Sequence, residues 1–185
     1  ELGLSDEHEG IMILNGNIKK GQKLTDALSI KEDTIFDFDL TPNRGDCFSH
    51  LGIARELAII ENKKIQFEKI IIKTSDYSIH DLVKVDIKDD NICDRYACRI
   101  VKNIKVEESP QWLKNKLLSI DQKPINNIVD IANYIMFDLG QPIHVFDYDK
   151  VDGKKININL ANKTDKINCL DNNLRNLDKN DIVIS

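Results

Sequence analysis

The chain has 185 residues, of which 41% are hydrophobic and 31% charged, and its formal net charge is −5. This is a globular composition, and no apolar run approaches the roughly 18 to 20 residues that span a bilayer, so a transmembrane protein is excluded. The acidic balance also excludes a surface that coats polyanions over its whole length, so any contact with nucleic acid must be local.

The cysteines give no sign of a metal site or of a disulfide framework. They form no CxxC pair and have no histidine at metal-ligand spacing, and the acidic pairs of the chain lack a third ligand. We therefore expect no metal and a reducing, cytoplasmic location. The four cysteines are Cys47, Cys93, Cys98 and Cys169.

The first predicted elements are a strand and a helix separated by a turn. Residues 34–40, TIFDFDL, alternate apolar and acidic side chains, which predicts a strand. The following TPNRGDCF is a turn by its Pro, Asn and Gly, so we interpret its Arg-Gly-Asp as a helix entrance rather than an adhesion signal. SHLGIARELAII then has apolar residues at helical spacing, with Asp46 or Ser49 as the expected cap.

A domain boundary is expected near residue 65, followed by two strands and a helix. LVKVDIKD alternates, and RYACRIVKNIKV places Tyr96, Cys98 and Ile100 on one face, so each predicts a strand. In SPQWLKNKLLSI the order of residues predicts a short helix, with Ser109 as its N-cap and Pro110 at its first position.

The last third of the chain predicts one amphipathic helix and several short strands. Apolar residues at a period of 3.6 predict a helix over 126–138, with Gly140 as its C-cap. IHVF, KINI and DIVIS each predict a strand, and the Asp-Asn-Asn turn at 171–173 predicts a hairpin. Without a regular βαβ rhythm, the fold class is α+β, with mixed or antiparallel sheets and a few short helices.

Asn133 and His144 are the candidate functional residues that spacing alone brings forward. Asparagine is a poor helix former, and Asn133 lies in the middle of the predicted helix, whereas Asn126 is placed to cap it. His144 lies between Ile143 and Val145 and therefore points away from both, either to solvent or to a pocket. A solvated amide and a solvated imidazole are the simpler alternatives.

Four longer motifs occur in one order along the chain. They are ELGLSDEHEGIMIL, LTPNRGDCFSHLGIARELA, RYACRIVKNIKVEESPQWL and KPINNIVDIANYIMFDLGQPIHVFD. Together they cover nearly the whole chain, which resembles the beta subunit of bacterial phenylalanyl-tRNA synthetase. The segment TPNRGD…GIARE is specific to synthetases, and it argues against a free-standing relative of the editing domain.

The resemblance implies a division of the chain and a set of partners. Residues 1–64 look like the end of an OB-type tRNA-binding insertion and the second half of the small N-terminal domain, and residues 65–185 look like the N-terminal part of the editing domain. The catalytic module would lie elsewhere, so ATP and Mg²⁺ would bind elsewhere and no cofactor is expected here. The implied partners are the phenylalanine tRNA and the alpha subunit of an alpha2beta2 enzyme, with neither DNA nor membrane.

The implied activity is post-transfer editing. A pocket shaped for Phe cannot strongly reject Tyr, because rejection of an added hydroxyl by a hydrophobic pocket reaches only about a hundredfold. The editing domain of this family hydrolyses Tyr that has been esterified to the phenylalanine tRNA by mistake. Its pocket hydrogen-bonds the hydroxyl group that Phe lacks.

The resemblance assigns roles residue by residue. His144 matches the pocket histidine of QPxHxFD and would place the ester or the attacking water, while Asn133 matches the asparagine of VDxTNY and would make a positioning hydrogen bond. Ala132 stands where many members have threonine, so one hydroxyl contact is missing. Lys123 replaces a common arginine, which keeps the charge but gives up bidentate phosphate geometry.

The resemblance also implies an incomplete pocket. In the family, the glutamate that reads the tyrosine hydroxyl and a glycine-rich pocket loop follow the region where Ser185 lies. We therefore expect an incomplete editing-domain fold, and an isolated chain without editing or synthetic activity. The alternative function is a non-catalytic scaffold that binds tRNA or the partner subunit.

Overall fold

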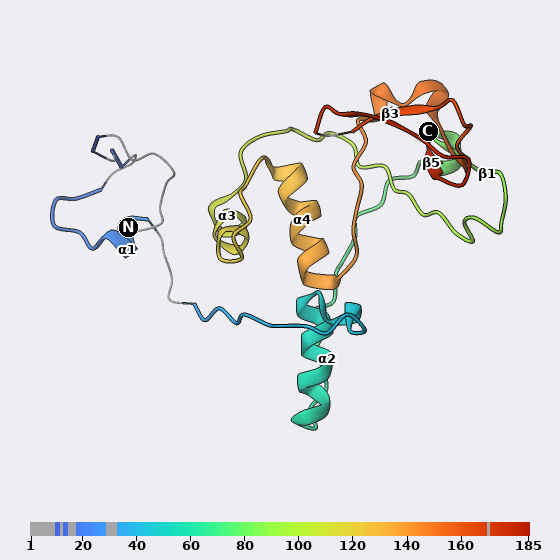
Figure 1. The fold of residues 1–185 in the computed structure, drawn as a ribbon. Helices are drawn as coiled ribbons and strands as arrows, with labels where there is room; N and C mark the ends of the chain where they lie inside the picture. The colour runs from blue at the N-terminus through green and yellow to red at the C-terminus, as the bar shows by residue number, and fades with distance from the viewer. Residues whose placement is uncertain (1–9, 12, 15–17, 29–32, 170) are drawn as a thin grey trace.

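The computed structural model describes residues 10–11, 13–14, 18–28, 33–169 and 171–185. Along the chain they form a short N-terminal part with helix α1 (Leu24–Ala27), a helical region and a sheet region (Figure 1). The accessible surface is 16741 Å², whereas a compact chain of 21.2 kDa exposes about 9,000 Å² by size scaling. The three parts are therefore spread out rather than folded around one core.

The helical region consists of α2 (His50–Ile60), α3 (Gln111–Leu118) and α4 (Asn127–Leu139). Helix α4 packs against both α3 and α2, and α2 continues below the lower end of α4 in Figure 1. A short 3₁₀ turn, η1 (Gly45–Cys47), leads into α2. The helices predicted within 49–60, 109–120 and 126–138 are thus confirmed, each within about two residues of its expected ends.

The sheet region contains one three-stranded sheet and one hairpin. Strand β2 (Lys155–Leu160) lies between β1 (Lys84–Ile87), which is parallel to it, and β5 (Ile182–Ile184), which is antiparallel. Strands β3 (Lys166–Asn168) and β4 (Leu174–Asn176) form the predicted hairpin, although Leu170 lies outside the described residues. The α+β prediction with mixed and antiparallel sheets is confirmed. The 3₁₀ turns η2 (Ile79–Asp81), η3 (Tyr148–Lys150) and η4 (Asp152–Lys154) flank this sheet.

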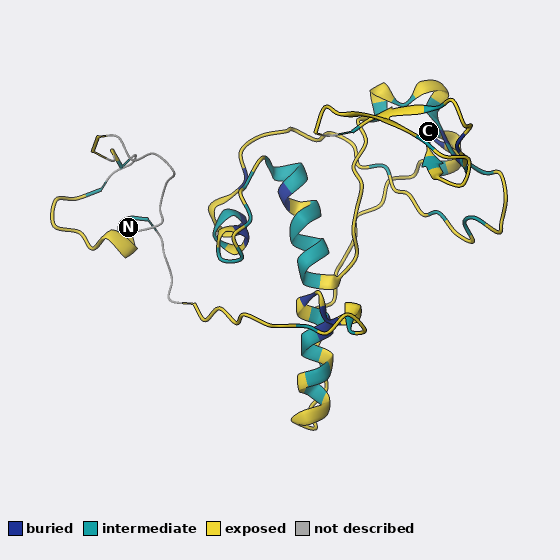
Figure 2. Ribbon diagram, in the orientation of Figure 1, coloured by how far each residue is buried: buried dark blue, intermediate teal, exposed yellow. Residues whose placement is uncertain are grey.

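The buried side chains form two small cores. In the sheet region Val83, Ile156 and Ile158 pack together, and half-buried side chains such as Tyr96 and Ile100 cover them. In the helical region the buried apolar residues are Leu113 and Leu117 of α3 and Cys47 of η1. Figure 2 shows how few buried residues the ribbon contains and how much of it is exposed. Within the described ranges, no helix is long and apolar enough to cross a membrane.

Three predicted strands are wrong. Residues 34–40, 95–106 and 143–146 carry the patterns on which strands were predicted, but none of them forms a strand in the structure. A strand requires backbone groups of a neighbouring strand as partners, and side-chain alternation alone does not supply them. The boundary near residue 65 stays a prediction, and the motif at 1–14 lies largely outside the described residues.

Candidate functional site

The N-terminus of α4 is fastened by its two leading asparagines. Asn126 caps the helix, because its side-chain oxygen accepts hydrogen bonds of 3.0 Å from the backbone N–H groups of Ile128 and Val129. Asn127 binds the preceding segment: its Nδ2 donates to Lys105 O at 2.9 Å, and its Oδ1 accepts from Glu107 N at 3.2 Å. These two asparagines are therefore structural, and the predicted cap is confirmed.

Asp130 lies completely buried in the first turn of α4. Its Oδ1 accepts a hydrogen bond from the backbone N–H of Ile125 at 2.8 Å, and its Oδ2 accepts one from the hydroxyl of Ser109 at 2.5 Å. The sequence pattern does not single out this residue, because an acidic side chain in a first helical turn is ordinary and points to no buried partner.

The hydrogen bond of Ser109 corrects the prediction for the start of α3. We expected Ser109 to cap this helix with Pro110 as its first residue, but Pro110 is itself in the cap position, with an extended ψ of 150°. The Ser109 hydroxyl donates instead to Asp130, twenty-one positions further along the chain. The partner is non-local, so the local capping pattern could not reveal it.

The C-terminus of α4 rests on the N-terminus of α2. Gly140 has a φ of +76°, the left-handed conformation that glycine adopts most readily, and a Cβ at this position would lie 3.0 Å from the Oγ of Ser49. The Ser49 hydroxyl accepts from Gly52 N at 3.0 Å and so caps α2. Beside it, the Nδ1 of His50 donates to the carbonyl oxygen of Phe137 at 3.1 Å. Helix α4 is thus held at both ends.

The four predicted site residues lie on α4 and on the segments that flank it. Asn133 and Ala132 are half-buried in α4, and Asn133 lies about one turn after Asp130. His144 is exposed on segment 141–147, where its ring lies 4.5 Å from that of Phe146. Figure 1 shows this segment leaving the lower end of α4 and turning toward the sheet.

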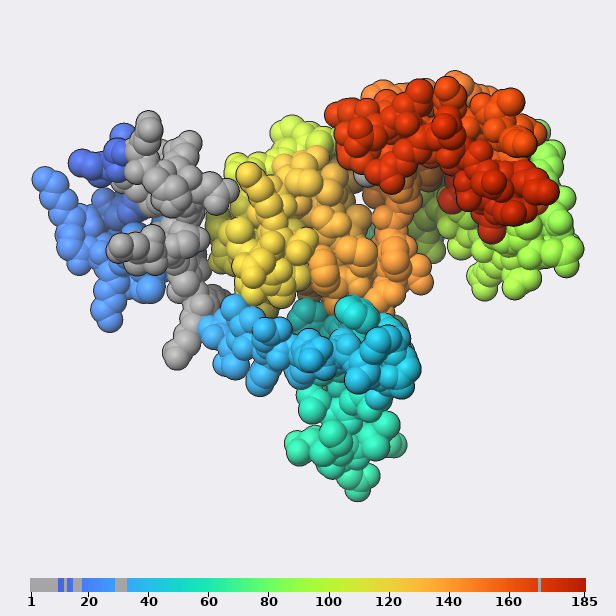
Figure 3. Space-filling view, viewed as in Figure 1, coloured from blue at the N-terminus to red at the C-terminus, as the bar shows by residue number. Residues whose placement is uncertain are grey.

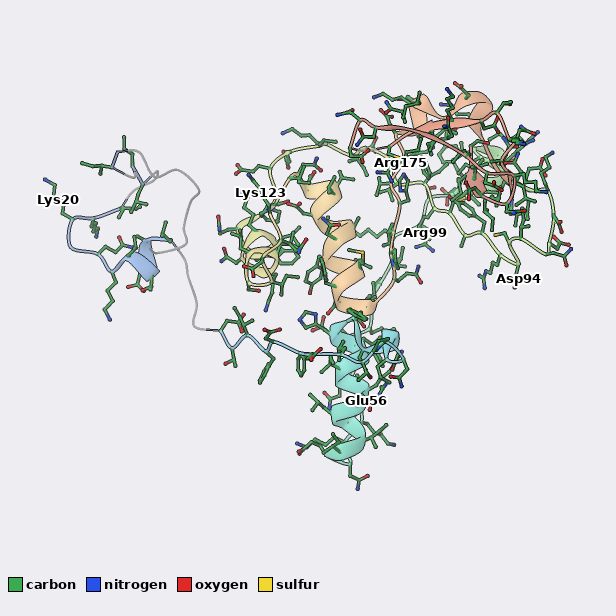
Figure 4. The ribbon with its side chains drawn as sticks, viewed as in Figure 1. Lys20, Glu56, Asp94, Arg99, Lys123 and Arg175 are labelled. Atoms are coloured by element: carbon green, nitrogen blue, oxygen red, sulfur yellow. The ribbon has the colours of Figure 1, made fainter. Side chains whose placement is uncertain are left out.

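Lys123 is exposed in the connection between α3 and α4, and Figure 4 shows it near the N-terminal end of α4. The structure thus brings the Lys123 connection and the helix of Asn133 together through Asp130. It gives no contact between Asn133 and His144, so their convergence on one pocket stays a prediction. Among the described residues, neither the Asn133 amide nor the His144 ring has a hydrogen-bond partner.

A hollow of about 270 Å³ lies at the sheet, between β2 and the segment that follows His144. Its lining includes Phe146, Val151, Ile156 and Ile184, but neither Asn133 nor His144. Phe146 joins this hollow to the candidate site, because its ring contacts that of His144.

The Arg-Gly-Asp turn has a structural role. Arg44 pairs with Asp46 at 2.9 Å and with Glu56 of α2 at 2.7 Å, and it holds the pKa of the Asp46 carboxyl down to about 2, mainly through their hydrogen bond. Burial raises the pKa of the neighbouring Cys47 thiol. The ligand atoms of Asp46, Cys47 and Glu56 lie within 4.8 Å of one another, and Arg44 supplies the positive charge among them. The turn therefore anchors α2, as interpreted from the sequence.

Comparisons with known proteins agree with the motifs. A model of the B3/4 domain matches residues 92–185. The phenylalanine–tRNA ligase beta subunits of Fusobacterium nucleatum, Clostridium acetobutylicum and Protochlamydia amoebophila are 45%, 40% and 39% identical to the chain, over 185, 187 and 185 residues. Each alignment covers 100% of this chain and 23% of the relative.

The chain thus spans about a quarter of the length of the curated relatives that it matches. Because the family model covers half of the chain and the likeness to the beta subunits extends over all of it, the resemblance expected from the motifs is confirmed. The chain belongs to the B3/4 domain family, in the form found in phenylalanine–tRNA ligase beta subunits.

Proposed function

We propose that the chain is part of the beta subunit of a phenylalanine–tRNA ligase and contributes half of its post-transfer editing site. That site hydrolyses Tyr that has been attached to the phenylalanine tRNA. The observation that carries the proposal is that the side chains of Asn133 and His144 are available for hydrogen bonding. Each presents a hydrogen-bonding group without a partner among the described residues, and α4, which carries Asn133, is fixed at both ends.

The chemistry requires a water molecule directed at the ester carbonyl. An imidazole can accept the proton of that water or orient it, which are the roles that His144 would take. The Asn133 amide both donates and accepts, so it can hold the ester or the terminal ribose in place. Lys123 would contribute a point charge to a tRNA phosphate, and Ala132 lines the pocket without a hydroxyl.

The proposed partners follow from the same assignment. The phenylalanine tRNA would present its acylated end to this site, and the alpha subunit would complete an alpha2beta2 enzyme in the cytoplasm. ATP and Mg²⁺ would act at the synthetic site, outside this chain. The isolated chain would neither charge tRNA nor edit it.

The test replaces His144 by Ala in the complete heterotetramer. We expect hydrolysis of Tyr from preformed Tyr-tRNA to fall by about a hundredfold or more, since a positioned acid–base group contributes at least that much. Charging with Phe should be unchanged, and Asn133→Ala should show a smaller loss of the same kind. His80→Ala removes an exposed histidine from η2 and serves as the matched control. Clearance of Tyr-tRNA by His144→Ala at the parental rate would refute the editing assignment.

An interaction scaffold is the second candidate function, and the exposed surface favours it. The chain exposes far more area than a compact protein of its mass, and the free end of α2 presents Leu57, Ile59 and Ile60 to solvent. Exposed apolar patches of this kind mark contact surfaces. If His144→Ala and Asn133→Ala both edit normally while Ile59→Asp weakens assembly of the heterotetramer, the scaffold is the function.

A further inference from the structure

We propose that Asp130 is a positioning residue that fixes the Lys123 connection relative to Asn133. This inference rests on the proposed editing function and deepens it, because it explains how Lys123 and Asn133, which lie in different segments, keep a fixed distance from one another. Asp130 itself is completely buried, so it touches no substrate. It acts through the backbone that its carboxylate holds.

The first half of the case is the contact to the connection. Oδ1 of Asp130 accepts the backbone N–H of Ile125 at 2.8 Å. Only Pro124 separates Ile125 from Lys123, and its ring locks its own φ and restricts the residue before it. The hydrogen bond at Ile125 therefore also restricts the position of the Lys123 backbone.

The second half is the position of Asp130 on α4. Residues three apart on a helix lie on the same side, so Asp130 and Asn133 belong to one face. The helix is capped by Asn126 at its start, and it contacts Ser49 and His50 at its end. With the helix held at both ends, the Asp130 carboxylate is the link that sets the distance from this face to Lys123.

The choice of a carboxylate also has a reason. Two donors converge on this point, the Ile125 N–H and the Ser109 hydroxyl, and a carboxylate offers two acceptor oxygens. No cation pairs with Asp130 in any part of the chain that the structure describes. Burying a carboxylate without a cation is costly, and an aliphatic side chain would fill the space at less cost. Holding two segments in register is what an aliphatic residue cannot do.

The test uses the complete heterotetramer and compares Asp130→Ala with Asp130→Asn. The alanine variant should hydrolyse Tyr-tRNA about 10- to 100-fold more slowly, because small misplacements of aligned groups cost that much, with Phe charging unchanged. In the asparagine variant the amide oxygen still accepts from Ile125 and the amide N–H₂ donates to the Ser109 oxygen. Its rate should return to within about threefold of the parent. An asparagine variant as slow as the alanine variant would overturn the inference, because charge rather than position would then matter.

A double-mutant cycle distinguishes positioning from loss of stability. Asp130→Ala should cost much less in a Lys123→Ala background than in the parent, since residues that act through one another are not additive. Fully additive losses would show that Asp130 acts on the fold alone. Ser109→Ala removes only one of the two hydrogen bonds, so it keeps the cycle informative if Asp130→Ala does not fold. Its expected loss lies between those of the asparagine and alanine variants.

Amide hydrogen exchange separates failure of this inference from failure of the proposed function. In Asp130→Ala the Ile125 amide should exchange faster than in the parent, whatever the site does. If His144→Ala slows editing but Asp130→Ala neither slows editing nor exposes the Ile125 amide, only the positioning role is wrong. If His144→Ala edits at the parental rate, the proposed function fails, and the positioning role fails with it.

Discussion

The helical region and the sheet region hold their backbones in place by different means. In the helical region single polar side chains join segments far apart in sequence, as Asp130 joins the starts of α3 and α4 and His50 joins α2 to α4. In the sheet region backbone ladders and a cluster around Ile158 do the same work. Figure 3 shows the two regions as separate lobes. A site built on the helical region is therefore sensitive to single side chains in a way that a ladder is not.

The largest expected effect comes from Leu113→Ala. If this substitution destabilised the sheet region as well as the helical region, the contrast between the two regions would fail. Leu113 is fully buried in α3, and removing it should cost about 2–5 kcal/mol. Trp112, the only tryptophan, reports on the helical region, so its fluorescence should show an earlier unfolding transition in denaturant. Leu118→Ala, at a side chain that is 54% exposed, is the control.

Amide exchange in β2 completes this first test. If the two regions are independent, the backbone amides of β2 should keep their protection in Leu113→Ala. Loss of protection throughout both regions at once would mean that they form a single cooperative unit. The side-chain links and the ladders would then differ in structure, but they would not give the two regions separate stabilities.

An intermediate loss of stability is expected from Asn126→Ala, which tests the contrast between side-chain links and backbone ladders at a single residue. The Asn126 side chain satisfies two N–H groups of α4, and loss of a helix cap costs about 0.5–2 kcal/mol. Asn176→Ala alters an exposed side chain in β4, where the ladder makes the backbone bonds, and should stay within about 0.5 kcal/mol. Chemical denaturation measures both, and equal losses would contradict the distinction.

The smallest effect concerns the pH dependence of the Arg44 turn. The pKa of Asp46 lies at about 2, below its ordinary value of 3.8, so ionised Asp46 stabilises the fold above pH 4. That contribution should disappear as the pH falls from about 4 toward 2. The stability difference between the parent and Asp46→Asn should narrow over this range in thermal unfolding. A stability difference that stays constant over this pH range would show that the charge of Asp46, paired with Arg44, does not stabilise the fold.

The sequence predicted those parts of the fold whose causes are local. Ser49, Asn126 and Gly140 lie at helix ends and act within three or four residues, so the pattern around each was sufficient. The strand predictions at 34–40, 95–106 and 143–146 failed because a strand depends on a partner that the segment itself does not encode.

The candidate site follows the same rule. Asn133 and His144 were singled out by their spacing and then by the motifs that they match, but their surroundings were not predictable from either. Asp130 was missed because its two partners, Ser109 and Ile125, are brought to it only by the packing of α3 on α4. What distinguishes Asp130 from an ordinary first-turn acid is burial, which no local pattern reports.

The seat of Gly140 on Ser49 has a mechanical consequence. Helices α4 and α2 meet end to end with their dipoles in the same sense, so together they form a strut of about 35 Å at 1.5 Å per residue. The Gly140–Ser49 contact and the His50–Phe137 hydrogen bond both lie at this junction, so a displacement of α2 acts on the C-terminal end of α4. A partner that binds the free end of α2 is therefore connected through this junction to the helix that carries Asn133.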